Sequence, residues 1–302
     1  MPELPEVQTI VSQLAPALRG ARIESVHIER EDVIREGRRS LATQCRGRKV
    51  EQVSREGKRL WFRLNGPGRN DYAALVIHLG MSGRLTLDAR DTPLLPHTHL
   101  RIRFEGNAHE LRFRDPRRFG GVWYVPQPTD GKTCASKNST AARTAPGLAP
   151  LGPDALTIRA DCLREITRRR RQIKAVLLDQ RIISGLGNIY CDEALYRAGI
   201  HPVTPASQLT DMQVRRLADC IRATLRSAVA AGGSTLRDYR DASGAEGWFQ
   251  VNHRVYGREG QPCRDCGAII QRSLIAGRST HTCPNCQTAT KAKPTRKRAV
   301  RS

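Results

Sequence analysis

Two C-x-x-C pairs near the carboxyl end constrain the fold of this chain more than any other feature. "CRDC" begins at Cys263 and "CPNC" begins at Cys283, and sixteen residues separate the two pairs. Each pair can form a tight turn, and two such turns can aim the thiolates of Cys263, Cys266, Cys283 and Cys286 at one tetrahedral ion. Four sulfur ligands leave no coordination position for water or substrate. We therefore predict one structural zinc ion in a C-terminal finger.

Charge and cysteine usage narrow the class of protein. The chain holds 51 Lys and Arg against 29 Asp and Glu, a formal net charge of +22, which favours a polyanionic partner. An anionic membrane is disfavoured, because no long basic helix with an aromatic face occurs. The chain has nine cysteines, and its N-terminus lacks the layout of a signal peptide. An odd number of cysteines without a secretion signal argues against a disulfide framework. With no run of eighteen apolar residues, we expect an intracellular, cytoplasmic protein without a membrane span.

The periodicity of apolar residues divides the chain into five segments. Period-two alternation dominates 1–126 after an initial helical stretch, whereas 150–250 is helical in pattern. Between them, 127–149 is rich in Pro, Gly, Ser and Thr and is typical of a linker or long loop. Residues 251–287 contain the zinc finger. The segment 288–302 has six basic residues and no acidic one, which predicts a disordered basic tail.

Within these segments, several elements can be placed. Helices are expected from Pro5, over 161–180, and from Asp211 until Gly232-Gly233 stops the pattern. In the strand "THLRIRF", Leu100, Ile102 and Phe104 should share one face. Together these patterns predict an α+β multi-domain protein.

Two glycine-marked regions are candidates for nucleic-acid contacts. "GLGNIY" opens a short helix that ends near Gly199, and free N–H groups at its start could hold a phosphate, although a plain turn between helices fits equally well. "HLGMSG" and "DPRRFGG" present Met81, Arg117 and Phe119. Met and Phe can wedge between base steps and Arg reads base edges, but ordinary hairpin turns remain an alternative from spacing alone.

The joint occurrence of "PELPEV", "HLGMSG", "DPRRFGG", "GLGNIY" and the four cysteines, in this order, resembles formamidopyrimidine-DNA glycosylase, over roughly residues 2–287. The resemblance implies an N-terminal β-sandwich flanked by helices, a helix–two-turn–helix domain and a zinc finger. It implies removal of oxidised purines (8-oxoguanine, formamidopyrimidines) from duplex DNA, then strand cleavage at the abasic site by β,δ-elimination. The partner would be double-stranded DNA that contains oxidised bases or abasic sites. The enzyme would be a monomer associated with the nucleoid.

The same resemblance assigns the catalytic residues. It implies that Pro2 is the nucleophile, Glu3 its acid–base partner, Lys58 the lysine that assists the lyase step and Arg278 the finger arginine on the phosphate beside the lesion. This assignment explains the N-terminus, because Pro5 and Glu6 suit a helix start but Pro2 and Glu3 are not needed for one. After removal of Met1, the α-amine of Pro2 would have a pKa around 8 and could attack a sugar carbon.

The resemblance also implies a set of DNA contacts. Met81, Arg117 and Phe119 would fill the gap left by the flipped base, with Arg117 facing the orphaned cytosine. The residues implied to contact DNA elsewhere are His97, Arg169, Lys174 and Asn188. Arg169 stands where the family often has lysine, as does Arg237. "SGAEGWFQ" matches the lesion-covering loop only loosely.

Two alternatives remain at this point. An endonuclease VIII-like glycosylase for oxidised pyrimidines would share the Pro-Glu start, although Leu4 and the intact Met-Arg-Phe trio favour the purine enzyme. A zinc-finger protein that binds DNA without catalysis would share the charge and the cysteines, but it would need no free amine at its terminus.

Overall fold

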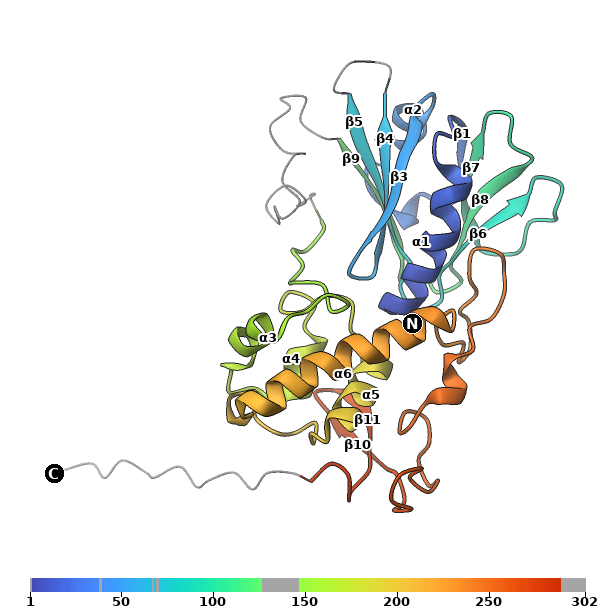
Figure 1. The fold of residues 1–302 in the computed structure, drawn as a ribbon. Helices are drawn as coiled ribbons and strands as arrows, with labels where there is room; N and C mark the ends of the chain where they lie inside the picture. The colour runs from blue at the N-terminus through green and yellow to red at the C-terminus, as the bar shows by residue number, and fades with distance from the viewer. Residues whose placement is uncertain (1, 38–39, 67, 69–70, 127–146, 289–302) are drawn as a thin grey trace.

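The computed structural model describes residues 2–37, 40–66, 68, 71–126 and 147–288, which form a strand lobe and a helical lobe (Figure 1). Most of the predicted linker and nearly all of the predicted basic tail lie outside these residues. The mixed architecture, with a four-cysteine cluster near the carboxyl end, confirms the predicted α+β fold class. Among the described residues, no helix is long and apolar enough to cross a membrane.

The strand lobe consists of two facing sheets and α1 (Leu4–Leu18). The five-stranded sheet has the order β2 (Ile34–Glu36), β9 (Gly121–Pro126), β5 (Tyr72–His78), β4 (Arg59–Asn65) and β3 (Lys49–Glu56). The four-stranded sheet has the order β1 (Ile23–Ile28), β7 (Thr98–Phe104), β8 (His109–Arg114) and β6 (Arg84–Ala89). Neighbouring strands are antiparallel except for the parallel pair β2 and β9. Two short elements, η1 (Glu31–Val33) and α2 (Leu41–Cys45), complete this lobe.

Alternating side chains build the core between the sheets. In β7, Leu100, Ile102 and Phe104 are buried as predicted, while Arg101 and Arg103 are partly exposed. Both arginines lie within salt-bridge distance of Glu110 on β8, which is itself fully buried. Because a buried carboxylate is costly unless it is paired, these contacts explain how the sheet tolerates it.

The helical lobe contains α3 (Ala160–Thr167), α4 (Ile173–Leu178), α5 (Asn188–Ala198), η3 (Ala206–Gln208) and α6 (Asp211–Ala230), followed by η4 (Phe249–Asn252). The helix predicted over 161–180 is thus two helices, and that prediction is corrected. In the break between them, the carbonyls of Arg169 and Arg171 accept hydrogen bonds from the N–H groups of Ser207 and Ala206. Tertiary hydrogen bonds have therefore replaced the continuation of the helix.

The last described element is a hairpin of β10 (Gln271–Ile275) and β11 (Arg278–Thr282). Ala276 and Gly277, at its turn, both have positive φ angles, as a tight hairpin turn requires. The strands lie between the two cysteine pairs and carry Arg278 at the start of β11.

Helix α1 joins the two lobes at its N-terminal end, which Figure 1 shows beside α6. Leu4 belongs to the apolar core of the helical lobe, whereas Val7 and Ile10 belong to the core between the sheets. Full burial of a leucine stabilises by about 1.5–3 kcal/mol. The first turn of α1 is therefore fixed to both lobes, and this fixes the residues before it.

Candidate active site and DNA interface

The N-terminus lies in a close contact with the loop that precedes α5. Pro2 is buried, and the N–H of Leu4 donates to the carbonyl of Gly185 at 3.1 Å. An added Cβ at Gly185 would collide with Leu4, and one at Gly187 would collide with the carboxylate of Glu3. The glycines of "GLGNIY" thus permit close approach of a backbone, and what approaches is the N-terminus of the same chain.

Glu3 occupies the N-terminal end of α5. Its side chain is buried, and its carboxylate accepts hydrogen bonds from the N–H groups of Gly187 at 2.7 Å and Ile189 at 3.0 Å. A helix N-terminus favours a negative charge. Of the two alternatives that the sequence left open, a phosphate at this helix start is disfavoured, because Glu3 already accepts from the N–H groups of Gly187 and Ile189.

Lys58 and Glu3 influence each other electrostatically. Burial raises the pKa of Glu3, and the nearby charge of Lys58 opposes that rise. Burial also lowers the pKa of Lys58, whereas Glu3 and Glu6 raise it and Arg278 lowers it further. The structure thus brings Lys58 close to Glu3, with Arg278 within electrostatic reach. A buried acid and amine with opposite shifts are suited to proton transfer.

The turn that carries Lys58 is held from two sides. Arg55, at the end of β3, donates to the carboxylate of Asp154 at 2.7 and 3.1 Å and to the side chain of Gln8 at 3.0 Å. It also donates to the carbonyl of Gly57 at 2.8 Å. Arg55 thereby ties the Lys58 turn to α1 and to the helical lobe.

Glu6 has a larger role than a favourable charge at a helix start. It is buried and accepts hydrogen bonds from the N–H of Glu3 at 2.8 Å, the N–H of Ser234 at 2.7 Å and the hydroxyl of Tyr190 at 2.5 Å. The Glu6 side chain thus connects the backbone of Glu3 to α5 and to the segment after α6. The Glu-x-x-Glu spacing of Glu3 and Glu6 is the sequence signal, since a capping box uses an acidic residue at that position.

A second corner joins α5 to the zinc-finger hairpin. Asn188 donates from Nδ2 to the carbonyl of Ser279 at 2.8 Å, beside Arg278, which is exposed. Lys174 is fully buried, and its ammonium donates to Asp192 at 2.6 Å, to Thr280 at 2.7 Å and to the carbonyl of Ser279 at 3.1 Å.

These contacts correct the prediction that Lys174 touches a phosphate. An ammonium group has three donors, and all three are used within the protein. Lys174 instead holds β11 against α5, with Asp192 also accepting a hydrogen bond from the N–H of His281 at 3.0 Å. The exposed charge at this corner is that of Arg278.

The predicted gap-filling trio comes together on two adjacent loops of the strand lobe. Met81 and Phe119 are 38 % and 56 % exposed, and the guanidinium of Arg117 lies over the Phe119 ring at 4.8 Å. The N–H of Arg117 donates to Ser82 at 3.3 Å, and Ser82 donates to Asp115 at 2.7 Å.

Asp115 organises this corner. It is fully buried, accepts a further hydrogen bond from the N–H of Gly120 at 2.8 Å, and donates its own N–H to the carbonyl of His97 at 3.0 Å. His97 is exposed and has a positive φ of 69°. Sequence reasoning missed Asp115, although it stands first in the quoted "DPRRFGG".

Arg169 is exposed at the break between α3 and α4, where its side chain donates to the carbonyl of Ile166 at 3.3 Å. No contact among the described residues joins it to the other predicted DNA-binding side chains. Its position leaves the charge accessible to solvent and to a polyanion.

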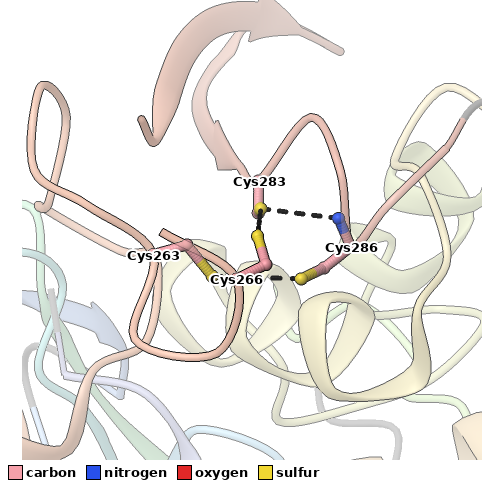
Figure 2. Close-up of side chains that lie close together, drawn as sticks. All are labelled: Cys263, Cys266, Cys283 and Cys286. Atoms are coloured by element: carbon pink, nitrogen blue, oxygen red, sulfur yellow. Dashed lines mark hydrogen bonds between the residues drawn. The ribbon is translucent and has the colours of Figure 1, made fainter. Parts of the chain in front are cut away.

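The four cysteines fit a metal site. Figure 2 shows their side chains converging, and their sulfur atoms all lie within 4.8 Å of one another. The Cys263–Cys286 and Cys266–Cys283 sulfur distances are 3.9 and 3.4 Å, too long for a disulfide. Tetrahedral zinc with bonds of ~2.3 Å separates its sulfur ligands by about 3.8 Å, so this donor set suits zinc. Gln287 ties the cluster to the helical lobe through the carbonyl of Ile200 at 3.0 Å.

Comparison with known proteins agrees with this arrangement. Family models match at residues 1–122 (formamidopyrimidine-DNA glycosylase N-terminal domain), 151–240 (its H2TH domain) and 260–289 (a zinc finger found in FPG and IleRS). A formamidopyrimidine-DNA glycosylase of Geobacillus kaustophilus is 41 % identical over 95 % of this chain and 100 % of its own length. One of Roseiflexus sp. is 44 % identical with the same coverage.

Solved structures give the same result. The MutM (FPG) protein of Thermus thermophilus superposes with a TM-score of 0.79 at 39 % identity, covering 96 % of this chain and 100 % of that one. A Lactococcus lactis FPG mutant in complex with Fapy-dG containing DNA superposes with a TM-score of 0.81 at 33 % identity, and the match covers 95 % of this chain and 100 % of that one.

Fold and site together define a DNA-repair glycosylase with abasic-site lyase activity, built from a strand domain, an H2TH domain and a zinc finger. The chain belongs to the formamidopyrimidine-DNA glycosylase family.

Proposed function

We propose that this enzyme removes oxidised purines from duplex DNA through a Schiff base on Pro2 and cuts the strand by β,δ-elimination. The observation that carries the proposal is the position of Pro2 and Glu3. Both are buried where the two lobes meet, with the Glu3 carboxylate held at the start of α5 and Lys58 close by.

The first chemical step is attack by the Pro2 nitrogen on C1′ of the damaged nucleotide. The C1′–base bond breaks, its electrons leave with the base, and the base takes up a proton. Loss of the amine proton and protonation of the sugar ring oxygen open the ring and form an iminium between Pro2 and C1′. Glu3, adjacent in sequence, is the proposed proton carrier at the sugar.

The iminium then makes strand cleavage possible because it acidifies the C2′ hydrogens. Removal of a C2′ proton breaks the C3′–O bond, and a second elimination breaks the C5′–O bond, which leaves phosphates at both ends. The lowered pKa of Lys58 supports a role in these proton transfers. Arg278, exposed at the start of β11, would bind the phosphate beside the lesion.

Contacts with the duplex follow from the exposed groups. Met81 and Phe119 would fill the space of the extruded base, and Arg117 would read the base left opposite. His97, Arg169 and Asn188 are proposed as further DNA contacts, and Lys174 as the residue that positions β11. Two relatives have been solved in complex with Fapy-dG containing DNA and with carbocyclic 8-oxo-G containing DNA, and they support the choice of oxidised purines.

One zinc ion held by the four cysteines would have a structural role, because its coordination is complete. A single chain supplies every residue of the proposed mechanism, so we propose a monomer. Because its substrate would be DNA, we propose that the enzyme acts at the chromosome, in the nucleoid.

The experiment that tests the proposal compares duplexes carrying 8-oxoguanine opposite cytosine and duplexes carrying thymine glycol. We expect faster cleavage of the first, with phosphates on both ends of the gap. Preference for thymine glycol would instead favour an endonuclease VIII-like specificity. Binding to both duplexes without cleavage of either would favour a DNA-binding protein without catalysis.

A further inference from the structure

Residues 234–248, called here the 234–248 loop, form a closed loop between α6 and the zinc finger. Its ends meet, because the N–H of Trp248 donates to the carbonyl of Ala231 at 3.0 Å and the N–H of Gly247 donates to Thr235 at 2.9 Å. Its tip is closed by Asp241, whose carboxylate accepts from the N–H groups of Ser243 and Ala245 at 3.0 and 2.9 Å. Compact loops of this length with adjoining ends are often functional.

The loop lies along α1 and is attached at both ends of its course. At its base, Ser234 donates its N–H to Glu6, the same side chain that accepts from the N–H of Glu3. At its tip, Gln13 donates to the carboxylate of Asp241 at 2.7 Å and accepts from the N–H of Ala242 at 2.8 Å. Gln13 lies seven positions after Glu6, about 10 Å along the helix.

The tip is held by hydrogen bonds and also by packing, since Ala242 is buried in the apolar core between the sheets. A cavity of about 420 Å³ lies beside it, lined in part by Leu14, Ala17 and Leu87. A further bond at the tip runs from the N–H of Leu87, on β6, to the carbonyl of Ala242 at 2.9 Å. Figure 1 shows the chain after α6, drawn in orange, rising beside β6 before it returns to the zinc finger.

We propose that Gln13 is a positioning residue that holds the 234–248 loop against the strand lobe and so fixes the loop for the base-release step. The inference rests on the proposed function, because the loop's base shares Glu6 with the backbone of Glu3. A loop fixed in advance loses less conformational freedom when a damaged base must be held. Cleavage of a preformed abasic site has no base to hold and should not need it.

The role of Gln13 can be tested by exchanging the two side-chain groups, so that position 13 carries the carboxylate and position 241 carries the amide. Gln13→Glu places two carboxylates against each other, and Asp241→Asn places an amide donor against the Gln13 donor. In the double variant, the new carboxylate can accept from both the new amide and the N–H of Ala242. The single variants should loosen the tip of the loop, and the double variant should restore it. Ser12→Ala, an exposed change on the same helix, is the matched control.

Two readouts separate a positioning role from a local structural one. Amide hydrogen exchange should rise at Ala242 and also at Leu87, whose N–H donates to Ala242 and not to Gln13. Single-turnover release of 8-oxoguanine should fall about tenfold in each single variant, as expected for a lost pair of hydrogen bonds, with unchanged cleavage of a preformed abasic site. The double variant should recover most of the protection from exchange and most of the rate of base release.

Each alternative outcome overturns part of the proposal. Unchanged exchange at Ala242 and Leu87 in Gln13→Glu would show that Gln13 does not anchor the loop. Faster exchange with unaltered base release, or an equal loss on abasic sites, would show that the anchor does not serve base release. If the unsubstituted protein releases no damaged base, the proposed function fails, while the exchange data still decide whether Gln13 holds the loop.

Discussion

The junction around Glu3 and the corner around Arg117 are both proposed to act on one damaged nucleotide, yet they are built in opposite ways. Glu3 is 2 % exposed, and both of its carboxylate oxygens accept hydrogen bonds from the start of α5. Met81 and Phe119 are 38 % and 56 % exposed, although the loops beneath them are fixed by the fully buried Asp115.

The difference separates two tasks. Groups that move protons must be aligned before substrate arrives, and burial with complete hydrogen bonding aligns Glu3. Groups that fill a gap in DNA contact their partner only in the complex, so their side chains stay exposed on a rigid support. Substitutions at the junction should therefore change reaction rates strongly, whereas substitutions at the corner should change discrimination modestly.

The largest effect is expected from Glu3→Gln. Loss of the carboxylate should lower base release about 10²–10⁴-fold, the usual range for general acid–base catalysis. Binding of lesion-containing DNA should persist, although one amide N–H at the start of α5 would face the new amide donor. Single-turnover kinetics and a binding titration check both expectations, with the surface change Glu105→Gln as control. Equal rates for the two variants would remove Glu3 from the reaction.

Disruption of the zinc cluster should come next in size. Cys283→Ser should release zinc and displace Arg278, which weakens DNA binding and slows cleavage. The strand lobe should keep its fold, because its core is a cluster of apolar residues separate from that around the cysteines. Metal analysis measures the loss of zinc, and circular dichroism measures whether the strand lobe keeps its fold. Full zinc occupancy in the variant would refute the ligand assignment.

At the exposed corner, Arg117→Ala should leave cleavage of an abasic site nearly intact and lower discrimination between cytosine and adenine opposite the lesion. A good base-edge contact contributes about 1–3 kcal/mol to such discrimination. Rates on the two duplexes give the ratio. An unaltered ratio, or a loss as large as that of Glu3→Gln, would break the contrast between corner and junction.

The smallest effect should be a change in salt dependence. The logarithm of the DNA association constant should fall with log[salt], and Arg169→Ala should reduce the slope by about 0.9, the value for one phosphate contact. Lys174→Met should not reduce the slope in this way, because Lys174 is buried and paired within the protein. The same reduction in both variants would contradict the distinction between the two residues.

Local patterns sufficed for features whose cause lies within a few residues. The alternation in β7, the helix stop after α6 and the spacing of the four cysteines are of this kind. The predicted bounds 1–126, 150–250 and 251–287 lie near the matched ranges 1–122, 151–240 and 260–289, and they stay predictions.

Features that depend on distant partners could not be predicted in this way. Burial of Lys174 requires Asp192 and Thr280, and the break before α4 requires hydrogen bonds from Ala206 and Ser207. Likewise, the donors at the start of α5 looked free because the N-terminus that occupies them is more than 180 residues away. The resemblance supplied the catalytic residues, whereas the supporting contacts of Glu6 and Gln13 emerged only from the structure.

The central claim is that the reacting nitrogen is that of Pro2, and borohydride trapping on a lesion-containing duplex tests it most directly. Lys58 is the nearby rival amine, since it is buried beside Glu3 with a lowered pKa. We expect reduction to link the protein to DNA, peptide mapping to place the link on the N-terminal nitrogen of Pro2, and a one-residue extension before Pro2 to abolish trapping and cleavage. A link on Lys58, or full activity in a mass-verified extended protein, would contradict the account.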